Sequence, residues 1–337
     1  MIIYASMKKL NPTIAVLLLG TLFSCNQKPV KKEATADFRF EEYSITQLQQ
    51  GYDNGDFTIT EVVQAYLDRI GAVDDSGPVL NAVIQTNPDA LAIAEQLDAE
   101  LKEGKKRGPM HGVPVLLKDN IDTHDQMATT AGSRALAGSH PLQDSYIAMK
   151  LREAGAVILG KANLSEWANF RGNLSSSGWS GVGGQTKNPY VLDRNPCGSS
   201  SGSGVAVSAN LCMIAIGTET NGSIVCPSTA NGIVGIKPTV GLLSRSGIVP
   251  ISFTQDTPGP MARTVTDAAT ALGAMTGVDT NDSKTAASEG KALTDYTPFL
   301  REDGLRGKRL GWFTSARGSH YKVDTLMQHA VDYIRSQ

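Results

Sequence analysis

The sequence predicts an α/β protein, and three observations support this prediction. Short apolar runs of strand length, such as 113–117 and 213–217, alternate along the chain with stretches of helical period. Strands that alternate with helices favour a mixed or mostly parallel sheet with helices on both faces. Hydrophobic residues make up 41% of the 337 residues and charged residues 19%, a composition that is ordinary for a globular protein with a sizeable core.

The expected elements follow one another at short intervals. Thr60 can cap a helix whose apolar face carries Val62 and Tyr66, and Gly104 is placed to end the next helix. Residues 172–185 are rich in glycine and serine and are expected to form a loop. Helices are expected at 60–70, 89–104, 144–155, 164–170, 201–210, 264–275 and 324–336, and strands at 82–84, 113–117, 156–159, 213–217, 233–236 and 308–313.

The first 25 residues are interpreted as a targeting segment and not as part of the fold. Lys8 and Lys9 precede an apolar run, 14–23, that is too short to span a bilayer, as in a signal peptide. The run ends in the sequence LFSC, which resembles the lipobox of bacterial lipoproteins and makes Cys25 the expected lipidated residue. Residues 26–40 are expected to form a polar tether. This interpretation predicts a bacterial lipoprotein held in the cell envelope through Cys25, with an uncleaved anchor or a plain secretory signal as the alternatives.

Charge and cysteine content exclude several classes of function. The net charge of −2 provides no basic surface for nucleic acid. Besides Cys25, the chain contains Cys197, Cys212 and Cys226, without a Cys-x-x-Cys pair and without a histidine nearby in sequence. We therefore interpret these three cysteines as small packing residues.

Residues 195–239 are crowded with glycine, serine and threonine, and short apolar runs cross them. Glycine lets a ligand approach the backbone closely, and hydroxyl groups both donate and accept hydrogen bonds. One interpretation is a loop-rich connector. The alternative, which we favour, is a site built from backbone N–H groups and hydroxyl groups.

This stretch resembles the signature of the amidase signature family of serine hydrolases. The matching motifs occur in order along about half of the chain: HGVP at 111–114, KDN at 118–120, GSSSG at 198–202, GTETNGSI at 217–224, GIKPT at 235–239 and DTPGPMARTV at 256–265. The resemblance implies a large mixed sheet flanked by helices on both faces. Family members extend well past the point at which this chain stops, so residues 41–337 are expected to form an amidase domain that is incomplete at its C-terminus.

The resemblance also implies a catalytic triad. Ser223 matches the nucleophile, Lys118 matches the base, and Ser199 matches a bridging serine that follows a cis peptide bond, here Gly198–Ser199. A serine hydroxyl needs a base to take its proton, and a lysine can serve only when burial favours its neutral form. Ser199 can pass a proton between the other two because a hydroxyl donates and accepts at once.

Further residues are assigned by the same resemblance. Backbone N–H groups expected to bind the oxyanion are those of Thr220, Asn221, Gly222 and Ser223, and the expected supporting residues are Gly198, Ser200 and Thr218. The family more often has aspartate at the position of Glu219, and many relatives have arginine where this chain has Val225. The implied chemistry requires no metal ion or organic cofactor.

Three other interpretations come from the residues themselves. Gly198 to Gly202 also fits Gly-x-Ser-x-Gly, the nucleophile elbow of α/β-hydrolases, with Ser200 as the nucleophile and only His320 or His329 as a following histidine. The glycine-rich loop could instead bind an anion without chemistry, although it lacks the end of a P-loop. A Ser-x-x-Lys sequence at 6–9 resembles that of penicillin-binding enzymes but lies in the targeting segment and is discarded.

The expected substrate is a small amide or the C-terminal amide of a peptide. Residues 224–227 and 248–257 look most like the bacterial peptide amidase branch of the family. The alternative is the glutaminase subunit of a tRNA-dependent amidotransferase. The sequence leaves the identity of the amide and the oligomeric state open.

Overall fold

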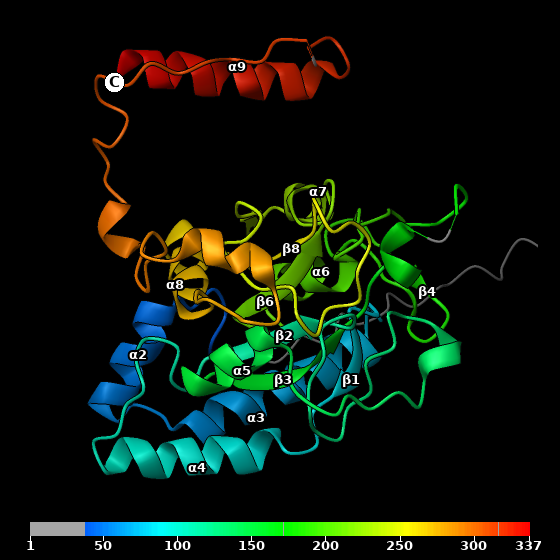
Figure 1. Ribbon diagram of the computed structural model, residues 1–337, viewed down its shortest axis with the longest axis vertical. Coiled ribbons are helices and arrows are strands. Elements are labelled where there is room, and N and C mark those ends of the chain that lie inside the picture. The colour runs from blue at the N-terminus through cyan, green and yellow to red at the C-terminus, as the bar shows by residue number, and fades with distance from the viewer. Residues whose placement is uncertain (1–37, 171, 316) are drawn as a thin grey trace, which may run out of the picture. The chain divides into compact units, whose positions relative to one another are not determined.

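The computed structural model describes residues 38–170, 172–315 and 317–337. The expected targeting segment 1–25, with Cys25, and residues 26–37 of the expected tether lie outside this description. Within it, Phe40–Gln337 form one structural unit. The predicted α/β class is confirmed, because a mixed sheet lies between helices (Figure 1).

The main sheet has six strands in the order β1-β3-β2-β6-β8-β7. Strand β2 is parallel to both of its neighbours, β3 and β6, whereas β1, β8 and β7 run antiparallel to the strands beside them. The four central strands β2, β3, β6 and β8 are buried along their whole length. The bounds are β1 Val83–Thr86, β2 Pro114–Lys118, β3 Val157–Ala162, β6 Ile214–Glu219, β7 Val234–Gly235 and β8 Thr257–Ala262.

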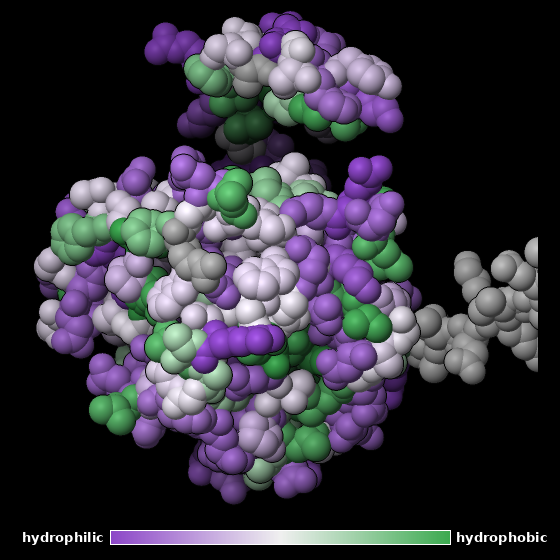
Figure 2. Space-filling model, turned by 90° about the vertical axis from the view of Figure 1, so that its right-hand side faces the viewer, coloured by the Kyte–Doolittle hydropathy of each residue, from purple (hydrophilic) through white to green (hydrophobic). Residues whose placement is uncertain are grey.

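Helices cover both faces of this sheet, as predicted (Figure 1). Helices α3 and α4 lie on one side, and α6 packs on the other side against β2, β3, β6 and β8. The helices are α2 Ile45–Asn54, α3 Ile59–Arg69, α4 Ala90–Lys102, α5 Tyr146–Glu153, α6 Ser201–Ser208, α7 Val225–Ala230, α8 Val265–Ala274 and α9 Tyr321–Ser336. Shorter turns are a π-helix at Ile70–Asp75 and 3₁₀ turns at Arg134–Leu136, Glu166–Asn169, Ser283–Ser288 and Thr297–Phe299. On the face shown in Figure 2, hydrophobic residues are scattered among hydrophilic ones.

Helix caps explain several boundaries. Ser44 and Thr58 each form a capping box with the side chain three residues later, at the start of α2 and of α3. The prediction of Thr60 as a cap is therefore wrong by two residues, and the hydroxyl of Thr60 donates instead to Asp98 at 2.7 Å. Thr264 caps α8, because its side chain accepts the N–H of Asp267.

Two predicted elements differ from the structure. The helix expected at 164–170 is only the short turn Glu166–Asn169, because Trp167 and Ala168 adopt left-handed backbone angles that interrupt a right-handed helix. The strand expected at 308–313 does not form. Those residues are largely exposed and have no neighbouring strand, and an apolar run becomes a stable strand only when it can pair. The loop expected at 172–185 contains a small hairpin, β4 Trp179–Ser180 and β5 Gly184–Gln185.

Candidate active site

Lys118 is the last residue of β2 and is fully buried. Its Nζ lies 2.8 Å from Ser199 Oγ, 2.9 Å from Thr218 Oγ1 and 3.2 Å from the carbonyl oxygen of Thr218. Burial lowers the pKa of Lys118 from 10.5 to about 7, against the opposing charges of Glu219 and Asp256. The buried strand thus brings a lysine that readily loses its proton into contact with Ser199.

The three contacts of Nζ match what a neutral amine can form. A neutral lysine has two N–H groups and one lone pair, and the carbonyl of Thr218 can only accept. If the second N–H faces Thr218 Oγ1, the lone pair faces the hydroxyl of Ser199. The Nδ2 group of Asn120 donates to the same Thr218 Oγ1 at 3.0 Å, so Thr218 and Asn120 hold the amine in place.

Ser199 and Ser200 form the turn before α6, and both are fully buried. The peptide bond between Gly198 and Ser199 is cis, as the family resemblance implied. The hydroxyl of Ser200 is committed to backbone groups, since it donates to the Thr218 carbonyl at 3.1 Å and accepts the Thr218 N–H at 3.2 Å. Ser200 therefore supports the turn, and no hydrogen bond joins it to a histidine in the described part of the chain.

Ser223 lies in the turn between β6 and α7 and is partly exposed. Its carbonyl accepts the N–H of Ser200 at 3.1 Å, which ties this turn to the one that carries Ser199. Its hydroxyl makes no hydrogen bond to another described residue. The structure thus joins Lys118 and Ser199 directly, and it brings the turn of Ser223 alongside them.

The carboxylate of Glu219 organises the turn that carries Ser223. It accepts the N–H groups of Gly222 at 2.7 Å, Ile224 at 2.7 Å and Val225 at 3.0 Å. The Gly222 N–H, one of the expected oxyanion donors, is thus engaged by Glu219 in this structure. The N–H groups of Thr220, Asn221 and Ser223 have no partner among the described residues.

A second buried lysine was missed by sequence reasoning. Lys161 on β3 donates to the carbonyl of Ile121 at 2.5 Å and to Thr129 Oγ1 at 2.9 Å. The neighbouring carboxylate of Asp119 accepts from the Thr130 hydroxyl and from the Gly132 N–H. These bonds hold the segment that follows Lys118. The signal available in the sequence was a lysine within an otherwise apolar strand.

The geometry agrees with a match to a known family. A family model described as Amidase matches residues 61–337. The chain belongs to the amidase family. It is 50% identical over 306 residues to a probable amidase of Arabidopsis thaliana, covering 90% of this chain and 58% of that protein. It is 43% identical over 262 residues to a subunit of the glutamyl-tRNA(Gln) amidotransferase of Acidothermus cellulolyticus, covering 77% of this chain and 50% of that protein.

The expected likeness to bacterial peptide amidases is confirmed by solved structures. The peptide amidase of Stenotrophomonas maltophilia is 54% identical with a TM-score of 0.84, and the match covers 89% of this chain and 61% of that one. A structure of the peptide amidase PAM in complex with the competitive inhibitor chymostatin matches at 54% identity and a TM-score of 0.85. The chain spans about half to three fifths of the length of these relatives.

The prediction of a bacterial lipoprotein with a signal peptide, located in the cell envelope, is wrong. Three curated relatives that are 50% identical to the chain come from a plant and two fungi, Arabidopsis thaliana, Schizosaccharomyces pombe and Arthroderma benhamiae, and are named as amidases. Among the described residues, no helix has the length and apolar character needed to cross a membrane. The expected lipid anchoring through Cys25 is withdrawn with it.

The interpretation of all three cysteines as packing residues is also corrected. Cys197 and Cys226 form a disulfide, although 29 positions separate them in sequence. Cys197 lies two residues before Ser199 and Cys226 lies three residues after Ser223, so the fold that joins the two serine turns also brings the two thiols together. Cys212 is free and buried, and burial raises the pKa of its thiol to about 12, which suits a packing role.

Reduction of this disulfide is expected to lower the melting temperature of the protein. A cross-link that closes a loop of about 30 residues stabilises a fold by about 3–4 kcal/mol through the unfolded chain. The measurement is a thermal melt with and without dithiothreitol. The variant Cys197→Ala/Cys226→Ala should melt at the temperature of the reduced wild type and should not respond to the reductant. Equal melting temperatures for oxidised and reduced wild type would contradict a stabilising cross-link.

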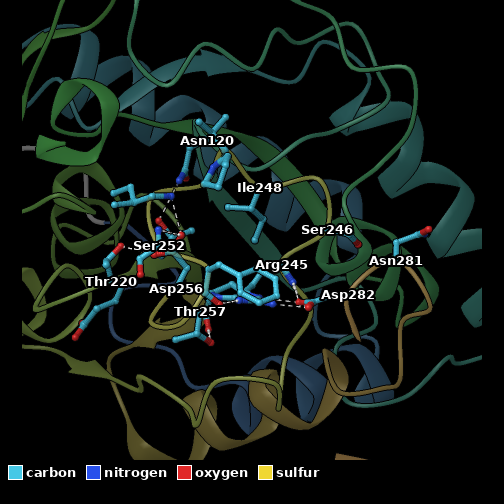
Figure 3. A pocket seen from close by; sticks show the side chains of 17 residues that line it. Asn120, Thr220, Arg245, Ser246, Ile248, Ser252, Asp256, Thr257, Asn281 and Asp282 are labelled. Carbon is cyan, nitrogen blue, oxygen red and sulfur yellow. Dashed lines mark hydrogen bonds and ion pairs between the residues drawn. The ribbon is translucent and has the colours of Figure 1, made fainter. Parts of the chain in front are cut away.

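A cavity of about 220 Å³ lies next to residues around the lysine amine, and Figure 3 shows the side chains that line it. Asn120 and Thr218, which hold the lysine amine, form part of its wall, and an ion pair between Arg245 and Asp282 forms another part. Apolar side chains line much of the remainder, namely Ile248, Val249, Pro250, Ile251, Phe253 and Pro258. Sequence reasoning had assigned no role to Arg245 or Asp282, which are 37 positions apart and carry no motif.

Proposed function

We propose that this amidase hydrolyses a carboxylic amide to a carboxylic acid and ammonia through an acyl-enzyme on Ser223. The observation that carries the proposal is the 2.8 Å contact between the fully buried Lys118 Nζ and Ser199 Oγ. A lysine whose amine is neutral near pH 7 can take a proton from a hydroxyl group. A lysine on the protein surface keeps its amine in water and does not form such a buried contact with a serine.

The proposed first step forms the acyl-enzyme. Neutral Lys118 takes the proton of Ser199, Ser199 takes the proton of Ser223, and Ser223 Oγ attacks the amide carbon. The negative charge that develops on the carbonyl oxygen is stabilised by backbone N–H groups of the Ser223 turn, for which Thr220, Asn221 and Ser223 remain available. When the C–N bond breaks, the proton held by Lys118 returns through Ser199 to the leaving nitrogen, and ammonia departs.

The proposed second step regenerates the enzyme. A water molecule gives its proton to Ser199, and through it to Lys118, as the water oxygen attacks the acyl carbon. Collapse of this second tetrahedral intermediate breaks the bond to Ser223 Oγ and returns the proton to that oxygen. The products are the carboxylic acid and free Ser223, so no proton is gained or lost by the residues over one cycle.

The proposed substrate class is the C-terminal amide of a short peptide. The 54% identity to a peptide amidase supports this class more than the 43% identity to an amidotransferase subunit supports glutamine. Val225 stands where many relatives have arginine and is partly exposed beside Ser223, which leaves an apolar group and no cation at this point. An apolar group at this point, with no cation to pair with a carboxylate, suits a neutral peptide amide better than the free carboxylate of an amino acid.

Ammonia release distinguishes the two substrate classes. The protein is incubated with an amidated dipeptide, with free glutamine and, as a blank, with the same dipeptide bearing a free carboxylate. We expect kcat/KM for the dipeptide amide to exceed that for glutamine by at least about tenfold, equivalent to about 1.4 kcal/mol in the transition state. A larger kcat/KM for glutamine would favour the amidotransferase function instead.

A further inference from the structure

Glu219 is a buried carboxylate placed close to the site at which negative charge develops. It is the last residue of β6, its side chain is 5% exposed, and it lies four residues before Ser223. An uncompensated carboxylate in this position would repel an oxyanion and would be costly to bury. Its three N–H donors compensate the charge, and all three belong to the turn that carries Ser223 or to the start of α7.

The two carboxylate oxygens bind N–H groups on both sides of the nucleophile. Oε1 accepts from Gly222, the residue before Ser223, and Oε2 accepts from Ile224 and Val225, the residues after it. The N–H groups of Asn221 and Ser223, which alternate with these, remain without a partner among the described residues. The Glu219 side chain therefore binds some N–H groups of this turn and fixes its conformation, while the other N–H groups remain available to a ligand.

We propose that Glu219 is a positioning residue for the acyl transfer at Ser223, because its carboxylate takes the N–H groups that flank the nucleophile and leaves those of Thr220, Asn221 and Ser223 to bind the oxyanion. This proposal rests on the proposed function. It assigns to Glu219, which also lines the cavity, a role that acts through the backbone N–H groups of the turn.

The charge of Glu219 has a second effect, on Lys118. Burial lowers the pKa of Lys118, while the negative charges of Glu219, on β6, and Asp256, just before β8, raise it. The other charged groups near the end of β2 are Asp119 and Lys161, which interact with the segment following Lys118. Removing the charge at Glu219 should thus lower the pKa of Lys118 further.

Two variants separate the shape of Glu219 from its charge. Glu219→Gln keeps the length of the side chain but replaces one acceptor oxygen with an NH₂ group that faces N–H donors. Glu219→Asp keeps the charge but shortens the reach to the three N–H groups. Each variant is measured for kcat and KM on the peptide amide, for inhibition by a peptide aldehyde and by the corresponding alcohol, and for the pH dependence of kcat/KM.

The aldehyde forms a tetrahedral adduct with an oxyanion, whereas the alcohol does not. For Glu219→Gln we expect kcat to fall by about 10²–10³-fold, the loss typical of one oxyanion donor, with KM unchanged. Binding of the aldehyde should weaken by a similar factor while binding of the alcohol stays the same. The acid limb of the pH profile should move to lower pH in Glu219→Gln and stay in place in Glu219→Asp.

Equal weakening of the aldehyde and the alcohol, or a raised KM with unchanged kcat, would overturn the positioning role. Glu219→Asp keeps the experiment decisive if Glu219→Gln does not fold, because the aldehyde-to-alcohol comparison applies to it as well.

Labelling of the wild type with a fluorophosphonate probe distinguishes a failure of the proposed function from a failure of the positioning role of Glu219. If the label lies elsewhere than on Ser223, the proposed function fails. If it lies on Ser223 and the Glu219 variants keep wild-type affinity for the aldehyde, only the positioning role fails.

Discussion

Replacement of Ser223 by alanine is expected to abolish covalent labelling by a fluorophosphonate probe and almost all turnover of an amide. The probe reacts with a serine hydroxyl that a base activates, and Ser223 is the proposed nucleophile. Loss of the nucleophile from a unit of this kind costs about 10⁶-fold in kcat in a well-studied serine protease. The measurements are mass spectrometry of the labelled protein and ammonia release.

Ser200→Ala is the matched control for this experiment. Its hydroxyl is bonded to the backbone of Thr218 on both its donor and its acceptor side, so its loss should reduce stability and leave labelling intact. Labelling that survives in Ser223→Ala and vanishes in Ser200→Ala would reject the proposed mechanism and would favour the α/β-hydrolase elbow.

The sequence was most informative where burial and spacing act together. The apolar run 113–117 predicted β2 to within one residue, and a lysine at the end of a buried strand predicted a lysine held in the interior. The family resemblance carried by the glycine- and serine-rich motifs implied which segments meet. Two of the three residues proposed as a triad, Lys118 and Ser199, lie within hydrogen-bond distance as a result.

Other features depend on contacts that no local pattern encodes. Strand β8 was not predicted because it contains Pro258 and Pro260, and proline normally argues against a central strand. Here the prolines pair with Thr218 and Ile216 of β6 in an antiparallel register. The disulfide likewise requires two thiols that are distant in sequence to meet, and spacing alone cannot choose among three cysteines.

The functional details of the serine turn were the hardest to predict. The resemblance named four backbone N–H groups, but only the folded turn shows that the Glu219 carboxylate engages Gly222. Thr218 forms bonds that hold Lys118, and Asn120 donates to the same Thr218 hydroxyl; both residues were recognised in motifs without a geometric role. The motifs therefore indicated which residues belong to the site. The hydrogen-bond partners of these residues became known only from the folded structure.

Replacement of Lys118 by methionine is expected to remove the base and to lower kcat by at least about 10²–10⁴-fold while the protein remains folded. Methionine fills a similar volume without a charge, and the site in the wild type already favours the uncharged amine. Ser199→Ala should cause a loss of the same order by breaking the proton path. Because the two residues work as a unit, the double variant Lys118→Met/Ser199→Ala should lose much less than the product of the two single losses. Losses that multiply would show that the two residues act independently.

The pH profile of the wild type tests the same base by another route. The pKa of Lys118 is lowered from 10.5 to about 7, so above pH 7 the neutral amine predominates and can accept a proton. As the pH falls through about 7, the ammonium form replaces it, and kcat/KM should fall about tenfold for each pH unit below that point. A lysine with an ordinary pKa would instead restrict activity to pH values near 10. A flat profile between pH 5 and 8 would therefore exclude Lys118 as the base whose deprotonation limits the reaction.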